Sequence, residues 1–236
     1  MIYKIESRQN QKIKDLAKLS NPKFSKEQKL FKIEGFHALE MAKESGALVS
    51  VFATSEIKDL EVPQYIVSKD IMESISESKS PQGVIAVCRY KEEKPITSDK
   101  VLLLDNVSDP GNLGTILRTA LAFGYNDVIL NEGCSEYNSK VLQSTQGAIF
   151  KLNILHNFDI SSLTDYELIA TEINGNVDLS TLCNIKKHIL VLGNEAHGVS
   201  KALIEKASKR ARIDIKDIDS LNVAIAGAIA MYQLSK

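Results

Sequence analysis

The chain has 236 residues, of which 44% are hydrophobic and 25% charged, and its formal net charge is −1. This composition excludes a disordered or collagen-like chain and suits one large domain or two small ones. The apolar runs are too short to span a bilayer, the N-terminal residues lack the apolar core of a signal peptide, and the three scattered cysteines fit neither a disulfide framework nor a metal site. We therefore expect a cytoplasmic globular protein with no membrane partner and no bound metal.

Basic residues concentrate at the N-terminus. Residues 1–32 carry nine Lys or Arg side chains against three acidic ones, a local net charge of +6. Clustered positive charge can neutralise nucleic-acid phosphates and release their counterions. A solvated helix face is the alternative interpretation. The candidate phosphate-contacting residues are Arg8, Lys12, Lys14, Lys18 and Lys32.

The first part of the chain, residues 1–92, predicts a small α/β domain. Apolar spacing favours helices over residues 11–19 and 36–43, strands over 49–53, 65–67 and 84–87, and a turn at 80–83. The charged, proline-containing stretch that follows lacks apolar periodicity, as is typical of a linker. We therefore predict a linker over residues 93–100 and a second domain over residues 101–236.

The second domain alternates short apolar runs with helical segments. The expected strands are 101–104, 128–130, 152–154, 168–170, 189–192 and 213–215. Continuous apolar strands separated by helices predict an α/β fold, with a parallel sheet covered on both faces. Ligands of such sheets bind beyond the carboxyl ends of the strands. Three polar motifs of this sequence lie at such positions.

The first motif follows the expected strand 101–104. Asp109 is suited to cap the next helix, Pro110 to occupy its first turn, and Gly124 to end it. Thr115, Arg118 and Thr119 share one face of that helix. A glycine-containing turn before a helix can bind an anion, but neither the Walker nor the GxGxxG pattern is present. A tight turn with Arg118 on the surface is the alternative.

The second motif follows the expected strand 189–192. Gly193 allows close approach of a ligand to the backbone, and Glu195 is placed either to orient a cation or to favour a helix start. His197 has no partner at metal-ligand spacing and is assigned to the loop. Ser200 is expected to cap a helix over residues 201–209.

The third motif follows the expected strand 213–215. An acidic loop leads to Ser220, which we expect to cap a final helix over residues 221–234. That helix is rich in alanine and glycine, which permit close helix contacts. Composition alone leaves two options open, a core helix or a dimer interface.

Taken in order, the motifs resemble those of the SpoU (TrmH-like) RNA ribose 2′-O-methyltransferases of the SPOUT superfamily. Residues 105–114 (DNVSDPGNLG) through 118–120 (RTA), 192–198 (LGNEAHG) and 220–223 (SLNV) carry the resemblance, with support from residues 140–150. Residues 32–35 and 80–87 resemble the substrate-binding domain of the family, an α/β/α sandwich similar to a ribosomal protein.

The resemblance implies a parallel-sheet catalytic domain with a deep C-terminal trefoil knot, and a homodimer formed through that domain. It implies S-adenosylmethionine as methyl donor, without a metal. The implied donor-binding residues are Thr171, Leu192, Gly193, Ile213, Leu221 and Asn222, and the implied catalytic residues are Asn112, Arg118, Glu195, Ser220 and Asn222. One departure is the sequence from Ile213 to Asp217, where the family usually has Ile-Pro-Met and a glycine.

The implied reaction is in-line attack of a ribose 2′-oxygen on the sulfonium methyl group. The family model makes the counterpart of Arg118 the base, but arginine stays protonated in proteins. We therefore expect Arg118 to bind the target phosphate and stabilise the developing alkoxide. The expected partner is RNA, ribosomal RNA before tRNA. The alternatives are methylation of tRNA ribose, methylation of an RNA base, and a noncatalytic RNA-binding or ribosome-assembly protein.

Overall fold

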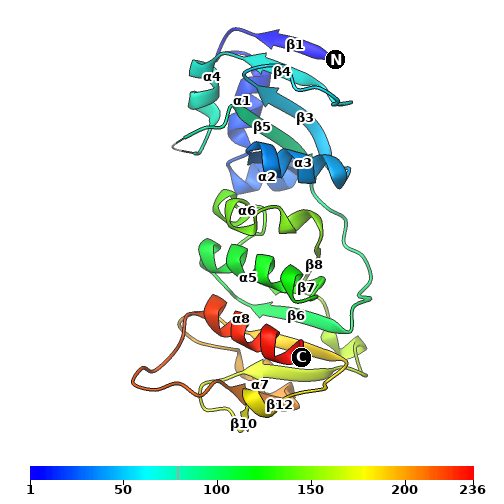
Figure 1. Cartoon of the computed structure of the whole chain (residues 1–236), viewed down its shortest axis with the longest axis vertical. Coiled ribbons are helices and arrows are strands. Elements are labelled where there is room, and N and C mark those ends of the chain that lie inside the picture. Colours follow the sequence, from blue (N-terminus) through cyan, green and yellow to red (C-terminus); the bar gives the residue numbers. More distant parts are fainter. Residues whose placement is uncertain (79) are drawn as a thin grey trace. The chain divides into compact units, whose positions relative to one another are not determined.

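The computed structural model describes residues 1–78 and 80–236. The chain forms two compact units (Figure 1), one made of Met1–Glu92 with Tyr137–Phe150 and one made of Glu93–Glu136 with Lys151–Lys236. The predicted division placed residues 137–150 in the second domain, whereas in the structure they pack with residues 1–92. The reason is aromatic packing. The ring of the buried Phe31 lies 4.8 Å from that of Tyr137 and 6.0 Å from that of Phe150.

The first unit is built on a mixed sheet of five strands. The strands are β1 (Ile2–Ile5), β2 (Leu30–Glu34), β3 (Leu48–Ala53), β4 (Gln64–Val67) and β5 (Val84–Arg89), and their spatial order is β1-β4-β3-β5-β2. Strands β1, β4 and β3 run parallel, while β5 is antiparallel to both β3 and β2. The helices are α1 (Gln11–Lys18), α2 (Pro22–Gln28), α3 (Phe36–Glu44), α4 (Lys69–Ile75) and α6 (Ser139–Thr145), with a 3-10 helix η1 at Ala148–Phe150.

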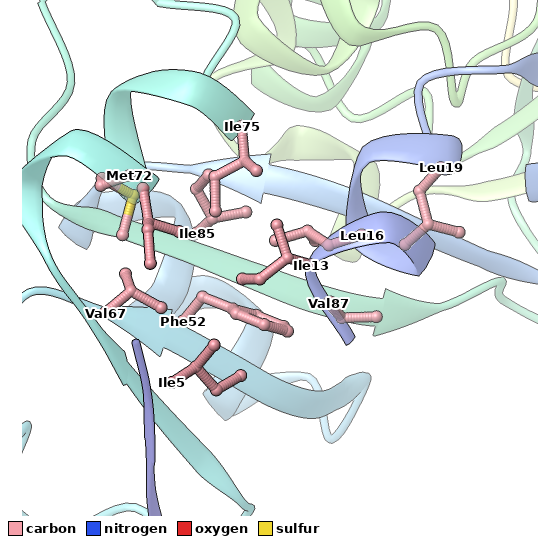
Figure 2. Packing of buried hydrophobic residues seen from close by; sticks show 11 residues of the cluster. Ile5, Ile13, Leu16, Leu19, Phe52, Val67, Met72, Ile75, Ile85 and Val87 are labelled. Atoms are coloured by element: carbon pink, nitrogen blue, oxygen red, sulfur yellow. The ribbon is translucent and has the colours of Figure 1, made fainter. Parts of the chain in front are cut away.

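One face of this sheet is covered by α1 and α4. Figure 2 shows Ile13 and Leu16 of α1 and Met72 and Ile75 of α4 meeting the sheet residue Phe52 and its neighbours. Helix α1 carries a strongly one-sided pattern, so Ile13 and Leu16 are buried while its lysines stay in solvent. Helix α3 packs against β2, β3 and β5 through Leu39 and Ala42.

The second unit is built on a sheet of seven strands that are all parallel. The strands are β6 (Lys100–Asp105), β7 (Asp127–Asn131), β8 (Asn153–His156), β9 (Glu167–Thr171), β10 (Val177–Asp178), β11 (His188–Leu192) and β12 (Lys209–Arg212), in the order β10-β12-β9-β11-β6-β7-β8. The helices are α5 (Pro110–Ala122), α7 (Lys201–Lys206) and α8 (Val223–Leu234), with 3-10 helices η2 (Ile160–Ser162) and η3 (Leu179–Thr181). The predicted α/β fold with a parallel sheet is confirmed.

Helices cover both faces of the parallel sheet. Leu203 of α7 joins the core on the face that carries Val101, Leu103 and Val191. Helix α8 packs against α5 and β11, side by side with α5 in Figure 1. The contact of α8 with β11 is close, because a Cβ atom on Gly227 would lie 2.6 Å from Leu192 Cδ1.

The expected strand 213–215 was wrong. The strand is β12, Lys209–Arg212, which is basic and half-exposed except at Ala211. It pairs with β9 on one side and β10 on the other. Apolar content predicted the strand at the wrong residues, because Ile213 and Ile215 lie beyond the end of β12 and line a cavity.

Candidate active site

A cavity of about 610 Å³ opens where β9, β11 and β12 end and α8 begins. Its lining includes five of the six predicted donor-binding residues, and Ser220: Thr171, Gly193, Ile213, Ser220, Leu221 and Asn222. Leu192, the sixth, is fully buried beneath Gly227 and is absent from the lining. The cavity lies beyond the carboxyl ends of parallel strands, where the fold class places ligand sites.

The tight turn after β11 requires glycine at position 193. A Cβ atom at this position would lie 2.1 Å from the carbonyl carbon of Gly198, so no other residue fits. The backbone of Asn194 exchanges two hydrogen bonds with Gly198, at 3.0 and 2.9 Å. The Asn194 side chain accepts hydrogen bonds from the N–H groups of Ala196 and His197, and donates one to the carbonyl of Asn106. The second motif is thereby tied to the loop of the first.

Glu195 closes that junction. Its carboxylate accepts hydrogen bonds from Ser108 N and Oγ (3.2 and 3.0 Å), from Asp109 N (3.0 Å) and from Asn112 Nδ2 (3.0 Å). Partial burial opposes ionisation, but the hydrogen bonds from Asn112 and from the backbone outweigh it and lower the pKa of Glu195 to about 2. The carboxylate is therefore ionised throughout the physiological pH range and acts as an acceptor only.

Asn112 and Asn222 extend the network to the third motif. The Asn112 Oδ1 atom accepts a hydrogen bond of 2.9 Å from Asn222 Nδ2, and the Asn222 Oδ1 atom caps α8 by accepting from Ala224 N and Ile225 N. The expected cap was Ser220, which was wrong. Since Glu195 only accepts and the backbone N–H groups only donate, both amide orientations are determined by their partners.

Arg118 stands apart from this network. It lies on the exposed side of α5, a turn and a half beyond Asn112, and its guanidinium makes no hydrogen bond or ion pair within residues 1–78 and 80–236. Asp109 caps α5 as predicted, accepting from Asn112 N at 2.8 Å. The structure thus brings Asn112, Glu195 and Asn222 into contact, with Ser220 beside the cavity, and leaves the guanidinium free for a ligand.

Two contributors were not anticipated. Asp105, the last residue of β6, accepts a hydrogen bond of 2.7 Å from Ser200 N and so joins the first loop to the start of α7. Glu172, directly after β9, lines the cavity, and its Oε2 atom is buried without a hydrogen-bond partner, 3.8 Å from Arg210 Nη1. The only sequence signal for a role of either residue in the site was its position as a carboxylate after an expected strand.

The basic residues of the first unit divide into two groups. Arg8, Lys12, Lys14 and Lys18 are exposed around α1, as a phosphate-contacting role requires. Lys32 is 7% exposed, and its ammonium donates to the carbonyl of Ile75 (3.0 Å) and pairs with Glu77 (3.1 Å). Because that ammonium is already paired and screened from solvent, Lys32 does not suit the phosphate-contacting role expected for it.

The described residues provide neither a metal site nor a membrane span. Among them, no group of three or more His, Cys, Asp or Glu side chains has an arrangement that could hold a metal ion. None of their helices combines the length and apolar character needed to cross a bilayer.

Comparison with known proteins identifies the family. The model of the SpoU rRNA Methylase family matches residues 99–232. The chain belongs to this family. An MRM3-like substrate binding domain matches residues 10–86. The predicted family membership, and with it the prediction of an RNA methyltransferase, are confirmed.

Relatives of this SpoU methylase match it over almost its whole length. The 23S rRNA (guanosine(2553)-2′-O)-methyltransferase RlmP of Bacillus subtilis is 36% identical over 98% of both chains. The AdoMet-bound rRNA methyltransferase from Sinorhizobium meliloti superposes with a TM-score of 0.88 at 26% identity, covering 98% of this chain and 97% of that one. The SpoU methyltransferase AviRb from Streptomyces viridochromogenes, 21% identical, shares the fold with a TM-score of 0.86 over 96% and 97% of the two chains.

Proposed function

We propose that this protein transfers a methyl group from S-adenosylmethionine to a ribose 2′-hydroxyl of ribosomal RNA in the cytoplasm. The observation that carries the proposal is the hydrogen-bonded series Glu195–Asn112–Asn222, which joins three loops distant in sequence beside one cavity. A series of this kind holds a site in one geometry, and a reaction that depends on alignment gains most from that. The 2′-O-methylation named for the Bacillus protein supports the same reaction, and the ribosomal RNA named for the Bacillus and Sinorhizobium proteins supports the same RNA class.

The cavity suits the methyl donor. Ile213, Ile215 and Leu221 offer apolar contact, and the tight turn at Gly193 exposes backbone groups beside them. The Oε2 atom of Glu172, which is buried without a hydrogen bond although Arg210 Nη1 lies 3.8 Å away, supplies an acceptor for a donor such as a ribose hydroxyl. The bound donor supplies an electrophilic methyl group on a positively charged sulfur, so no metal is needed for the chemistry.

The residues of the chain then have separate roles. Arg118 binds the phosphate of the target nucleotide and stabilises the negative charge that develops on the 2′-oxygen as the hydroxyl proton is released to water and the methyl group leaves the sulfur. Ser220, at the cavity edge, orients that hydroxyl. Asn112 and Asn222 are positioning residues, because their amides are occupied by Glu195 and by the start of α8. Glu195 keeps the first loop in place.

We further propose that the active form is a homodimer. Helix α8 exposes Ile225 (52%), Ile229 (40%) and Tyr232 (53%) on one side while its opposite side is buried. A helix that is apolar on all sides is normally buried on all sides. The exposed apolar side of α8 therefore matches the same side of α8 in a second copy of the chain. The trefoil knot implied by the family resemblance remains a prediction.

The first experiment measures methyl transfer. Labelled S-adenosylmethionine is incubated with unmodified ribosomal RNA and, in parallel, with tRNA, using Arg118→Ala as the control variant. Label in ribosomal RNA that Arg118→Ala abolishes supports the proposal. Alkaline digestion then locates the methyl group, because 2′-O-methylation blocks cleavage beside the modified sugar. Label that leaves every linkage cleavable would indicate a base methyltransferase, and donor binding failure would indicate a noncatalytic protein.

The role of Arg118 is tested by Arg118→Lys. Lysine supplies a point charge but not the planar pair of donors that a phosphate and an alkoxide share. We expect kcat to fall by about 100-fold or more, with donor affinity unchanged, because an electrostatic donor of this type contributes that much to a rate. Turnover within a few-fold of the parent would rule out a role that needs the guanidinium group.

A further inference from the structure

Three aromatic side chains line up across the first unit. Phe52 of β3, Tyr65 of β4 and Tyr3 of β1 occupy matching positions in three adjacent parallel strands. The ring centroids of Phe52 and Tyr65 are 4.8 Å apart, and those of Tyr65 and Tyr3 are 5.6 Å apart with their planes inclined by 25°. We call Phe52, Tyr65 and Tyr3 the aromatic row.

The row runs from the core to the edge of the sheet. Phe52 is 2% exposed and packs with Ile5, Val67 and Ile13, as Figure 2 shows. Tyr65 is half-buried, and Tyr3 is 46% exposed on β1, the edge strand. The Tyr3 hydroxyl contacts Met1 Sδ at 3.3 Å, and its ring meets no aromatic partner beyond Tyr65 among the described residues. The outer end of the row is therefore open to solvent.

Positive charge borders the row. The Lys12 ammonium of α1 lies 5.9 Å from the centroid of the Tyr65 ring, a cation–π arrangement. Lys14 is exposed on the same short helix, and neither lysine forms an ion pair within the described part of the chain. The nearest acid on α1, Asp15, is engaged by Gln11 and Lys18. An aromatic row with the Lys12 ammonium over one of its rings matches a polyanion that carries flat, stackable groups.

We propose that the aromatic row, with Lys12 at its side, binds single-stranded RNA by stacking an unpaired base on Tyr3. Tyr3 already stacks on Tyr65, and a nucleobase extends the row by one member. Cross-strand packing explains why Tyr3 touches Tyr65. It does not explain why the outer ring of Tyr3 faces solvent while Lys12 lies over the neighbouring Tyr65 ring. A base of any identity fits, because every base offers a flat π-face. This inference rests on the proposed function, since it assumes an RNA substrate.

The test compares Tyr3→Leu with the parent for binding of fluorescein-labelled oligouridine and of an RNA duplex. Leucine keeps an apolar side chain on the strand but removes the ring. We expect single-strand affinity to fall about tenfold, the usual contribution of one stacked base, with the slope of affinity against salt concentration unchanged. Duplex affinity stays the same, because paired bases offer no free face. Tyr3→Phe retains the ring and should bind as the parent does.

Two controls separate a lost stack from a damaged fold. Phe36→Leu removes another exposed aromatic ring of the same unit, at the start of α3, and should leave RNA binding unchanged. Tyr3→Leu should also keep the thermal midpoint of the parent to within a few degrees, because Tyr3 is half-exposed. The inference is overturned if Tyr3→Leu and the parent bind single-stranded RNA with equal affinity while their thermal midpoints agree. Such a result would favour a protein partner that binds the aromatic row.

Methyl transfer keeps this inference distinct from the proposed function. Tyr3→Leu should raise the KM for ribosomal RNA about tenfold and leave kcat and donor affinity unchanged. A parent that transfers no methyl group to any RNA defeats the proposed function, whatever Tyr3 does. A parent that is active while Tyr3→Leu has an unchanged KM defeats the inference alone.

Discussion

At the scale of single residues, the candidate site depends on one ionised carboxylate. Glu195 gathers four hydrogen bonds from the first loop, and the direction of each later bond follows from its being an acceptor only. Asn112 must present its amide nitrogen to Glu195, so its oxygen faces Asn222. Both asparagines donate a hydrogen bond through Nδ2. An ionised aspartate has no such donor, which explains why the motifs use asparagine at these two positions.

Glu195→Gln should change the pH dependence of stability. The pKa of Glu195 is lowered from an ordinary value of 4.5 to about 2 in the folded protein. The ionised group therefore stabilises the fold above pH 4.5, and this contribution is lost as pH falls toward 2. Thermal midpoints of parent and variant should differ most above pH 4.5 and converge as pH falls below it. A difference that stays constant from pH 7 to pH 3.5 would contradict this, and Glu205→Gln, on the exposed side of α7, is the control.

The local sequence predicted several of these groups correctly and others wrongly. It predicted Asp109 as a helix cap because Pro110 follows it, a purely local signal. It chose Ser220 as the cap of α8, whereas Asn222 has the role. Both residue types are good caps, so local preference alone had no means to choose between them. The contact of Glu195 with Ser108 spans 87 positions, and no local pattern encodes it.

At the scale of elements, apolar runs predicted strands well where the strands are fully buried. Strands β6 and β11 were expected from their continuous apolar residues, since helices cover both faces of them. Strand β12 failed this criterion because three of its four residues are basic. Short elements such as β1, α2 and α4 were not predicted, as their patterns are too brief to separate from loops.

Helix α8 gives a prediction about assembly. We expect the parent to be a dimer, and Ile229→Lys to be a monomer, because a charge in the middle of a buried apolar contact carries a large desolvation cost. Size-exclusion chromatography with light scattering measures both masses. The matched control is Ile218→Lys, which places the same charge at a 57% exposed position in the loop before Ser220 and should remain dimeric. A monomeric parent would refute the proposed interface.

At the scale of the whole molecule, the sequence predicted two α/β parts and a parallel sheet but not the order of the strands. Alternating strands and helices are local features, whereas the order β10-β12-β9-β11-β6-β7-β8 depends on which helix covers which face. The sequence likewise did not predict that residues 137–150 belong to the first unit, because their placement depends on aromatic contacts of Phe31 with Tyr137 and Phe150.

The basic N-terminal region should determine how RNA binding responds to salt. Replacing Lys14 and Lys18 with Gln removes two exposed charges near α1. If each contacts one phosphate of single-stranded RNA, the slope of log affinity against log salt should fall by about 1.4, with donor binding unchanged. Filter binding at several salt concentrations measures this slope. The control replaces Lys43 and Lys58, which are exposed elsewhere in the same unit, and should keep the parent slope. An unaltered slope in the Lys14/Lys18 variant would refute the phosphate contacts.

The packing of residues 137–150 with the first unit has a consequence for biosynthesis. Phe31 is 1% exposed in the finished protein, and its partners Tyr137 and Phe150 are translated more than a hundred codons later. While the chain emerges from the ribosome, Phe31 has only Tyr90, 6.1 Å away, as an aromatic partner until position 150 has left the exit tunnel. A gene fragment that encodes only residues 1–92 would leave the Phe31 ring without its contacts to Tyr137 and Phe150.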